Sequence, residues 1–215
     1  MTVQIAFDTY HTYDAMTAHL QALADAYPKL CTLTSIAKSH QGRDVWFMTI
    51  TNPDTGPALE KPGFYIDAQI HAEEHATSAT ALYACAYLLN NYGTDEEVTR
   101  LVDQMVFYII PRINPDGAEN AMTAPYHPWC GNGRFLPGED RIEGLIPQDI
   151  TGDGYIVQMR VPDSKGEWKC DSENPDIMVQ REPGEEGGTY YRLYPEGMVR
   201  DYDGVHVHIE MQEDG

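Results

Sequence analysis

Three apolar runs with strand character, separated by segments of helical spacing, constrain the fold of this chain most strongly. The runs cover residues 44–51, 63–70 and 104–110, and the last of them is continuously apolar from Met105 to Ile110, directly before Pro111. A continuous apolar run between turn-forming residues is typical of a buried central strand. Strands that alternate with helices predict an α/β fold, with a mixed, mostly parallel sheet flanked by helices.

Helical spacing of apolar residues predicts the elements between these runs. Pro28 closes the first helix, and Gly93 is suited to close the second because glycine tolerates the left-handed conformation that often follows a helix. A further short strand is rich in β-branched residues. The helices are expected at residues 13–27, 77–91 and 95–102, and this strand at residues 30–36.

The composition of the chain changes after Gly117. Gly, Pro, Asp and Glu dominate there, and the apolar periodicity fades. Short strands are expected at residues 154–161, 189–193 and 205–210. We interpret residues 1–215 as one domain of this α/β type, with a loop-rich elaboration at about 118–215 and no internal repeat.

The charge and hydropathy of the chain exclude several classes of partner. A formal net charge of -20 repels a phosphate backbone, so nucleic acid is not an expected partner. No apolar stretch approaches the roughly 18 residues of a membrane span, so no membrane partner is expected either. The first residues lack the basic and apolar regions of a signal peptide, which makes the cytoplasm the default expectation.

Four cysteines are spread along the chain, at positions 31, 85, 130 and 170, without a C-x-x-C pair. This spacing argues against a thiolate zinc site. Cys85 lies in an apolar helical segment and is expected in the core. Cys130 and Cys170 both fall in the loop-rich half, and the sequence leaves open whether they pair.

The segment HAEEH, residues 71–75, is the strongest candidate for chemistry. His71 and Glu74 lie three residues apart where a predicted strand gives way to a predicted helix, so one tight turn can aim both side chains at one point. An imidazole nitrogen and a carboxylate are zinc ligands, and a catalytic zinc site adds a third protein ligand and a water. We therefore predict that His71 and Glu74 bind a metal ion.

Two other interpretations of HAEEH stay open on the residues alone. Acidic residues are favoured at a helix N-terminus by the helix dipole, so the segment is also a suitable polar helix start. The pattern H-x-x-E-H further matches metalloproteases in which His71 and His75 both bind zinc and Glu74 is the base. That alternative requires the motif within one helix, and the strand character of the preceding residues disfavours it.

A second motif, Asn-Pro-Asp-Gly at residues 114–117, follows the strand predicted at 104–110. Alone it predicts a turn, because proline fixes one φ and glycine permits positive φ. Together with Ser39-His40-Gln41-Gly42-Arg43 and the H-x-x-E pair, in this order, it resembles the M14 family of zinc metallocarboxypeptidases. The resemblance covers roughly residues 8–120.

This resemblance implies a function that the residues alone do not give. Members of the family hold Zn²⁺ with the H-x-x-E pair and a later His, and a later Glu serves as general base for hydrolysis of a C-terminal peptide bond. The implied substrate is a peptide or protein C-terminus. Arg134 is the candidate for the arginine that polarises the substrate carbonyl, both as a catalytic and as a substrate-binding residue.

The chain departs from the family pattern at several points. No Asn-Arg pair follows Gly117, and the late His206 and His208 do not fit the position of the missing ligand. Glu73 stands where some members carry a substrate-binding arginine. We therefore expect a C-terminally truncated fold, with the third zinc ligand and the general base beyond residue 215.

Three alternatives accompany this expectation. A zinc amidase or deacylase would use the same H-x-x-E site, and a non-catalytic binding module would keep the fold without the reaction. Separately, the loop that begins at Asp149 resembles the first half of an EF-hand, but Arg160 stands where the bidentate Glu is expected. A Ca²⁺ site is the alternative there to a simple Asx turn, which we favour.

Overall fold

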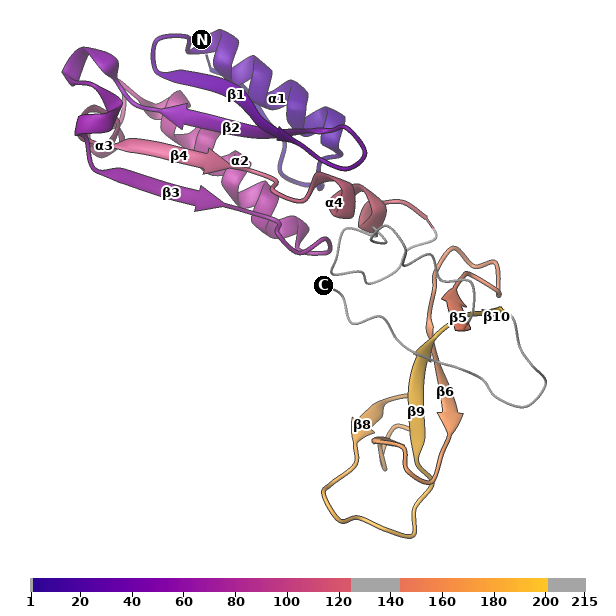
Figure 1. Ribbon diagram of the computed structural model, residues 1–215. Coiled ribbons are helices and arrows are strands. Elements are labelled where there is room, and N and C mark those ends of the chain that lie inside the picture. The colour runs from indigo at the N-terminus through magenta and orange to yellow at the C-terminus, as the bar shows by residue number, and fades with distance from the viewer. Residues whose placement is uncertain (1, 125–143, 201–215) are drawn as a thin grey trace. The chain divides into compact units, whose positions relative to one another are not determined.

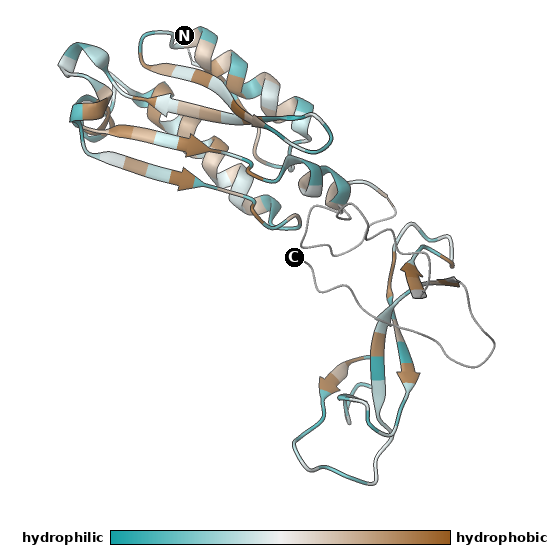
Figure 2. Cartoon of the chain, viewed as in Figure 1, coloured by the Kyte–Doolittle hydropathy of each residue, from teal (hydrophilic) through white to brown (hydrophobic). Residues whose placement is uncertain are grey.

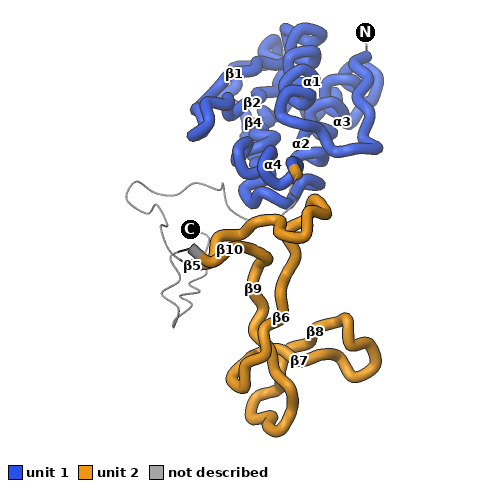
Figure 3. The backbone as a smooth tube through the Cα atoms, turned by 90° about the vertical axis from the view of Figure 1, so that its right-hand side faces the viewer, with its two compact units in different colours: residues 1–123, 128–135, 214–215 blue, residues 124–127, 136–213 orange. Residues whose placement is uncertain are grey.

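The computed structural model describes residues 2–124 and 144–200. The chain divides into two compact units, which Figure 3 distinguishes by colour. Among the described residues, the first unit comprises residues 2–123, and the second comprises residue 124 and residues 144–200. The sequence-based interpretation as one domain stays a prediction.

The first unit is built on a four-stranded sheet with the strand order β1-β2-β4-β3 (Figure 1). Its strands are β1 (Cys31–Lys38), β2 (Asp44–Ile50), β3 (Gly63–Asp67) and β4 (Val106–Ile110). The predicted mixed sheet is confirmed, but its parallel share is smaller than expected. Strands β3 and β4 are parallel, whereas β2 is antiparallel to both of its neighbours. Strands β1 and β2 follow one another through a short turn, and such a hairpin requires antiparallel pairing.

Helices cover one face of this sheet, as the views in Figures 1 and 3 both show. They are α1 (Tyr13–Ala26), α2 (His75–Asn91) and α3 (Glu96–Gln104), and the short α4 (Pro115–Met122) follows β4. Two 3-10 turns, Pro53–Thr55 and Ala58–Glu60, connect β2 to β3. Within the described residues, none of the helices combines the length and apolarity that crossing a bilayer requires.

Capping residues explain where the helices begin and end. The side chain of Thr12 accepts the amide of Ala15 at the start of α1. The carboxylate of Asp95 accepts the amides of Glu97 and Val98 at the start of α3. Each such cap satisfies amides that the helix itself leaves unpaired, and is worth about 1 kcal/mol. Gly93 has φ of +80° just after α2, as expected of a residue that ends a helix.

The core of the first unit lies between the sheet and the helices. Strand β4 is predominantly apolar, as the hydropathy colouring of Figure 2 shows. Side chains that are fully buried there come from both layers, and burying each stabilises the fold by about 1.5–3 kcal/mol. They include Leu20, Leu23, Met48, Ile50, Leu82, Leu89, Val102 and Ile109.

The parallel pair β3–β4 determines where polar loops meet. Asp67 pairs with Ile110 at the carboxyl ends of the two strands. Because parallel strands end at the same edge of a sheet, the loops that follow them leave side by side. These are the loop of residues 68–74, which contains the H-x-x-E pair, and the loop that leads to Asn114.

The second unit contains two small antiparallel sheets. One pairs β5 (Gly144–Pro147) with β10 (Gly197–Arg200). The other has the order β6-β9-β7-β8, and its strands are β6 (Gln158–Pro162), β7 (Trp168–Cys170), β8 (Met178–Gln180) and β9 (Tyr191–Pro195). The strands predicted at 154–161 and 189–193 overlap β6 and β9. The strand predicted at 205–210 lies outside the described residues.

Candidate metal centre

The connection between β3 and α2 has a shape that the sequence prediction missed. We expected the strand to continue to residue 70, but it ends at Asp67, and the helix begins at His75. Gln69 has φ of +54°, a left-handed conformation that a strand cannot continue through. The predicted junction is thus a distinct turn of residues 68–74, and both His71 and Glu74 lie in it.

The side chains of His71 and Glu74 converge. The Nδ1 atom of His71 lies 3.2 Å from Oε1 of Glu74. Two ligand atoms that each lie about 2.1 Å from a tetrahedral zinc ion are about 3.4 Å apart, so this donor pair fits the two adjacent corners of such a site. The same separation also fits an ion pair when the imidazole is protonated.

Both side chains are open to solvent. The His71 side chain is 53% exposed and that of Glu74 is 45% exposed, so an ion and a substrate can reach them. The neighbouring Glu73 is also exposed, whereas Ala72 between them is fully buried. The turn is therefore anchored at the buried Ala72 and presents the side chains of His71 and Glu74 outward.

The Asn-Pro-Asp-Gly motif contacts this turn directly. The Asn114 backbone N–H donates to the carbonyl of Gln69 at 3.2 Å, and its side-chain amide donates to the carbonyl of Ile70 at 3.2 Å. Its Oδ1 accepts the amide of Gly117 at 3.0 Å, so Asn114 also caps α4. The sequence predicted a turn here, and the structure adds that the turn begins a short helix.

The Ser-x-x-Gly-Arg motif forms the turn between β1 and β2 and binds Asp116. The carboxylate of Asp116 accepts the Ser39 hydroxyl at 2.7 Å, the Gln41 amide at 2.9 Å and the Arg43 guanidinium at 2.7 Å. Burial raises the pKa of Asp116, but these three donors outweigh it and hold the pKa below its usual range. The motif therefore positions the loop that carries Asn114.

His75 is engaged away from the His71–Glu74 pair. Its Nδ1 lies 2.8 Å from the side-chain nitrogen of Gln69, and its ring packs 5.5 Å from that of Tyr10. Burial, and after it the positive charge of Arg112, lower the pKa of His75. The H-x-x-E-H alternative would require the whole motif to lie within one helix. His71 lies outside helix α2, so this requirement is not met.

Arg112 is a buried charge that the sequence interpretation passed over. It is 3% exposed, lies 3.2 Å from the Glu119 carboxylate and donates to the carbonyl of His11 at 2.8 Å. Glu119 also accepts the amide of Tyr13. This network joins α4 to the start of α1. The signal in the sequence was a lone arginine directly after a buried strand, where no solvated surface is expected.

Several sequence-based candidates fall outside the described residues. They are Arg134, His206, His208 and Cys130, so the role of Arg134 and the pairing of Cys130 with Cys170 stay predictions. Among residues 2–124 and 144–200, no cluster of three His, Cys, Asp or Glu side chains is placed to hold a metal. His71 and Glu74 therefore stay predicted ligands, and the described part of the chain places no third candidate beside them.

In the loop after Asp149, carboxylates accept backbone amides, and the bond from the Tyr155 amide to Asp153 is an Asx turn of the kind that we favoured. Both carboxylate oxygens of Asp149 are engaged, because Oδ1 accepts the amide of Gly152 at 2.6 Å and Oδ2 accepts that of Gly154 at 2.9 Å. Asp153 similarly accepts the amide of Tyr155. Carboxylates turned toward backbone amides in this way give the Ca²⁺ alternative no support.

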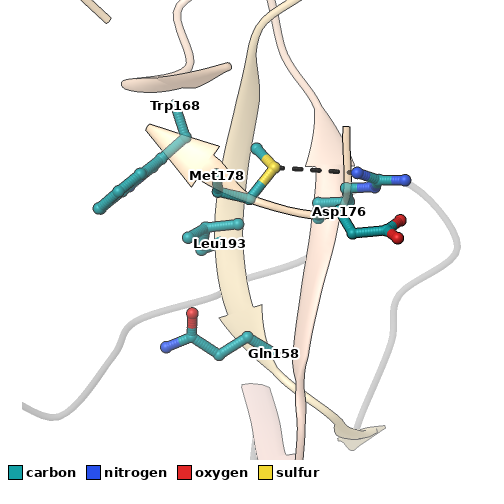
Figure 4. A pocket seen from close by; sticks show the side chains of 6 residues that line it. Gln158, Trp168, Asp176, Met178 and Leu193 are labelled. Carbon is teal, nitrogen blue, oxygen red and sulfur yellow. Dashed lines mark hydrogen bonds between the residues drawn. The ribbon is translucent and has the colours of Figure 1, made fainter. Parts of the chain in front are cut away.

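The second unit carries a pocket of about 440 Å³ on its larger sheet (Figure 4). Trp168, Met178 and Leu193 give it apolar walls, and Asp176 adds a carboxylate. Arg160, which also lines it, donates to the carbonyl of Pro175 at 2.8 Å. Of these residues, the sequence interpretation had named Arg160 alone, at the end of the loop that resembles half of an EF-hand.

The comparisons with known proteins agree on one family. The family model described as zinc carboxypeptidase matches residues 16–141, more than half of the chain. A zinc carboxypeptidase of Saccharothrix mutabilis subsp. capreolus is 31% identical over 126 residues, and carboxypeptidase M of Mus musculus is 33% identical over 127 residues. These alignments cover 57% and 58% of this chain and 28% of each relative, so the chain matches about a quarter of their length.

Solved structures give the same fold. Carboxypeptidase A from Helicoverpa armigera superposes with a TM-score of 0.55 at 26% identity, covering 66% of this chain and 36% of that one. Thrombin activatable fibrinolysis inhibitor, at 23% identity and a TM-score of 0.56, covers 62% of this chain and 32% of its own, and supports the fold alone. By its sequence match and its α/β architecture, this chain belongs to the zinc carboxypeptidase family, peptidase family M14.

Proposed function

We propose that this chain forms part of a zinc-dependent carboxypeptidase, in which His71 and Glu74 hold the ion and a peptide or protein C-terminus is the substrate. The observation that carries the proposal is the 3.2 Å between the imidazole nitrogen and the carboxylate oxygen. Family membership supports it, since the curated relatives named above are carboxypeptidases.

In this proposal the residues of the turn divide the work. His71 offers a nitrogen donor and Glu74 an anionic oxygen donor, while Asn114 holds the backbone between β3 and the pair in place. When bound, the ion supplies Lewis-acid chemistry and lowers the pKa of water, as hydrolysis of an amide requires. The third ligand, the general base and the polarising role of Arg134 are further expectations from the family resemblance.

Zinc binding tests the ligand assignment. The variants are His71→Ala and Glu74→Ala, and Glu73→Gln is the matched control because it removes an exposed neighbouring charge outside the pair. We expect the Zn²⁺ affinity, measured by competition with a chromophoric chelator, to fall at least about tenfold in the two ligand variants. It should stay within about twofold in the control. Equal zinc binding by wild type and His71→Ala would remove His71 as a ligand.

Substrate chemistry tests the reaction class. Matched peptides with free and amidated C-termini are incubated with the zinc-loaded chain, and the products are identified by mass spectrometry. Hydrolysis restricted to the free carboxylate supports a carboxypeptidase. Cleavage of both peptides favours the amidase or deacylase alternative.

A further inference from the structure

Gln69 adopts a backbone conformation that glutamine rarely accepts. Its φ is +54°, and among the described residues it is the one non-glycine residue with positive φ. The left-handed region is unfavourable for residues with a Cβ, and glycine or asparagine normally occupies it. Such a conformation persists where the surrounding contacts over-determine it.

The side chain of Gln69 is buried and serves two acceptors. The residue is 1% exposed, and its Nε2 donates to the carbonyl of Ala72 at 3.0 Å. The same nitrogen lies 2.8 Å from Nδ1 of His75. A side-chain amide has two N–H groups, so it can reach both when Nδ1 carries its lone pair. Ala72 lies between the two proposed ligands, and His75 directly follows the second.

The backbone of Gln69 ties the same turn from the other side. Its N–H donates to the Thr77 hydroxyl at 3.0 Å, and that hydroxyl donates to the carbonyl of Glu74 at 2.7 Å. Its carbonyl accepts the amide of Asn114 at 3.2 Å. One residue thereby links the end of β3, the turn, the first residues of α2 and the Asn114 loop.

The side chain of Gln69 adds a second unfavourable feature to the left-handed backbone. The Oε1 atom of Gln69 is buried and has no hydrogen-bond partner among the described residues. An unpaired buried acceptor is unfavourable, as is the left-handed backbone. A glycine would avoid both costs but would also lose the two side-chain donations. Glutamine at this position therefore makes two donations to the turn that glycine could not make.

We propose that Gln69 is a positioning residue for the His71–Glu74 pair, which it holds by fixing the carbonyl of Ala72 and the ring of His75. The proposal rests on the proposed function of that pair. Outer contacts that orient the ligands of a metal typically change its affinity 10- to 100-fold when they are removed.

The test uses the full chain with Gln69→Gly, which suits the backbone conformation but removes the donors. Ile70→Ala is the matched control, because Ile70 is adjacent and 59% exposed. We expect Gln69→Gly to bind Zn²⁺ about 10- to 100-fold more weakly, and to change the visible absorption spectrum of bound Co²⁺. The urea midpoint should stay near that of the wild type, and the control should match the wild type throughout.

Hydrogen exchange in the metal-free chain gives an independent readout. In Gln69→Gly the amides of Glu74, His75 and Thr77 should exchange at least about tenfold faster, while that of Ile109 in the sheet is unchanged. Unchanged turn amides with unchanged Zn²⁺ affinity would overturn the proposal, and so would equal acceleration of turn and sheet amides. If the turn opens but His71→Ala binds zinc as well as wild type, the proposed function fails while the positioning of the turn stands.

Discussion

Asp116 provides the sharpest test of how the motifs hold one another. It is 3% exposed, and its carboxylate accepts one hydrogen bond each from Ser39, Gln41 and Arg43. Asp116→Asn keeps the shape of the side chain but replaces one acceptor oxygen with an N–H₂ donor. A donor then faces another donor, and the charge opposite Arg43 disappears.

The expected loss follows from these contacts. One lost hydrogen bond to a charged acceptor is worth about 1.5–3 kcal/mol. The lost ion pair adds roughly 1 kcal/mol, well below the value for a fully buried pair, because the Arg43 side chain is 26% exposed and solvent screens it. We expect Asp116→Asn to lower the free energy of unfolding of the first unit by about 2.5–4 kcal/mol. Asp8→Asn, at an exposed position, should stay within about 0.5 kcal/mol of wild type.

Native-state hydrogen exchange is the suitable assay, because two compact units need not unfold in one transition. The amides of Ile50 and Ile109 report the opening of the sheet in the first unit. The low pKa of Asp116 adds a pH signature. A carboxyl whose pKa is lowered on folding stabilises the fold above its unfolded pKa of about 3.9, and this stabilisation is lost as the pH falls through the lower folded value.

The difference between wild type and Asp116→Asn should therefore be full at pH 7 and shrink below about pH 4. A loss under about 1 kcal/mol at pH 7 would refute the reasoning, because it would mean that the three donors are satisfied equally well by water. A difference that is the same at pH 3 and pH 7 would show that the carboxylate charge contributes nothing.

Two further predictions concern the core of the first unit. Leu20 is fully buried in α1, so Leu20→Ala should lower the free energy of unfolding by about 2–5 kcal/mol in the same exchange assay. A loss below about 1 kcal/mol would contradict the packing described for α1. Burial raises the pKa of the Cys31 thiol to about 11 and also raises that of Cys85. Iodoacetamide at pH 8 should therefore modify either residue only after urea unfolding, as peptide mapping would show. Rapid labelling of native Cys31 would contradict its burial.

The regular elements of the first unit were predictable because their signals are local. Apolar spacing and capping residues determined helix α1 and strand β2 to within about one residue, and Gly93 marked the end of α2. The exit of β3 was not predictable, since glutamine carries no signal for a left-handed residue. The backbone bend at Gln69 depends on Thr77, across the turn, and on Asn114, which is distant from it in sequence.

The residue types of the candidate site were predictable, whereas the hydrogen bonds that hold the site in place were not. The spacing of His71 and Glu74 predicted a converging pair, and the two side chains do converge, whereas their role as ligands stays a prediction. The binding of Asp116 by the turn after β1 joins residues 77 positions apart, which no local pattern reveals. In the second unit, strands such as Met178–Gln180 are too short for a periodic signal, so four of its six described strands were missed.

The parallel pairing of β3 with β4 has a consequence for the order of folding. The bond from Asn114 to Ile70 spans 44 residues, and helices α2 and α3 lie between β3 and β4 in the sequence. Contacts of such separation close large chain loops and therefore form late. A nascent or excised peptide of residues 63–91 would thus contain both His71 and Glu74 but lack the hydrogen bond from Asn114 that holds their turn. In such a peptide the two side chains would be free to move relative to one another when they bind a cation.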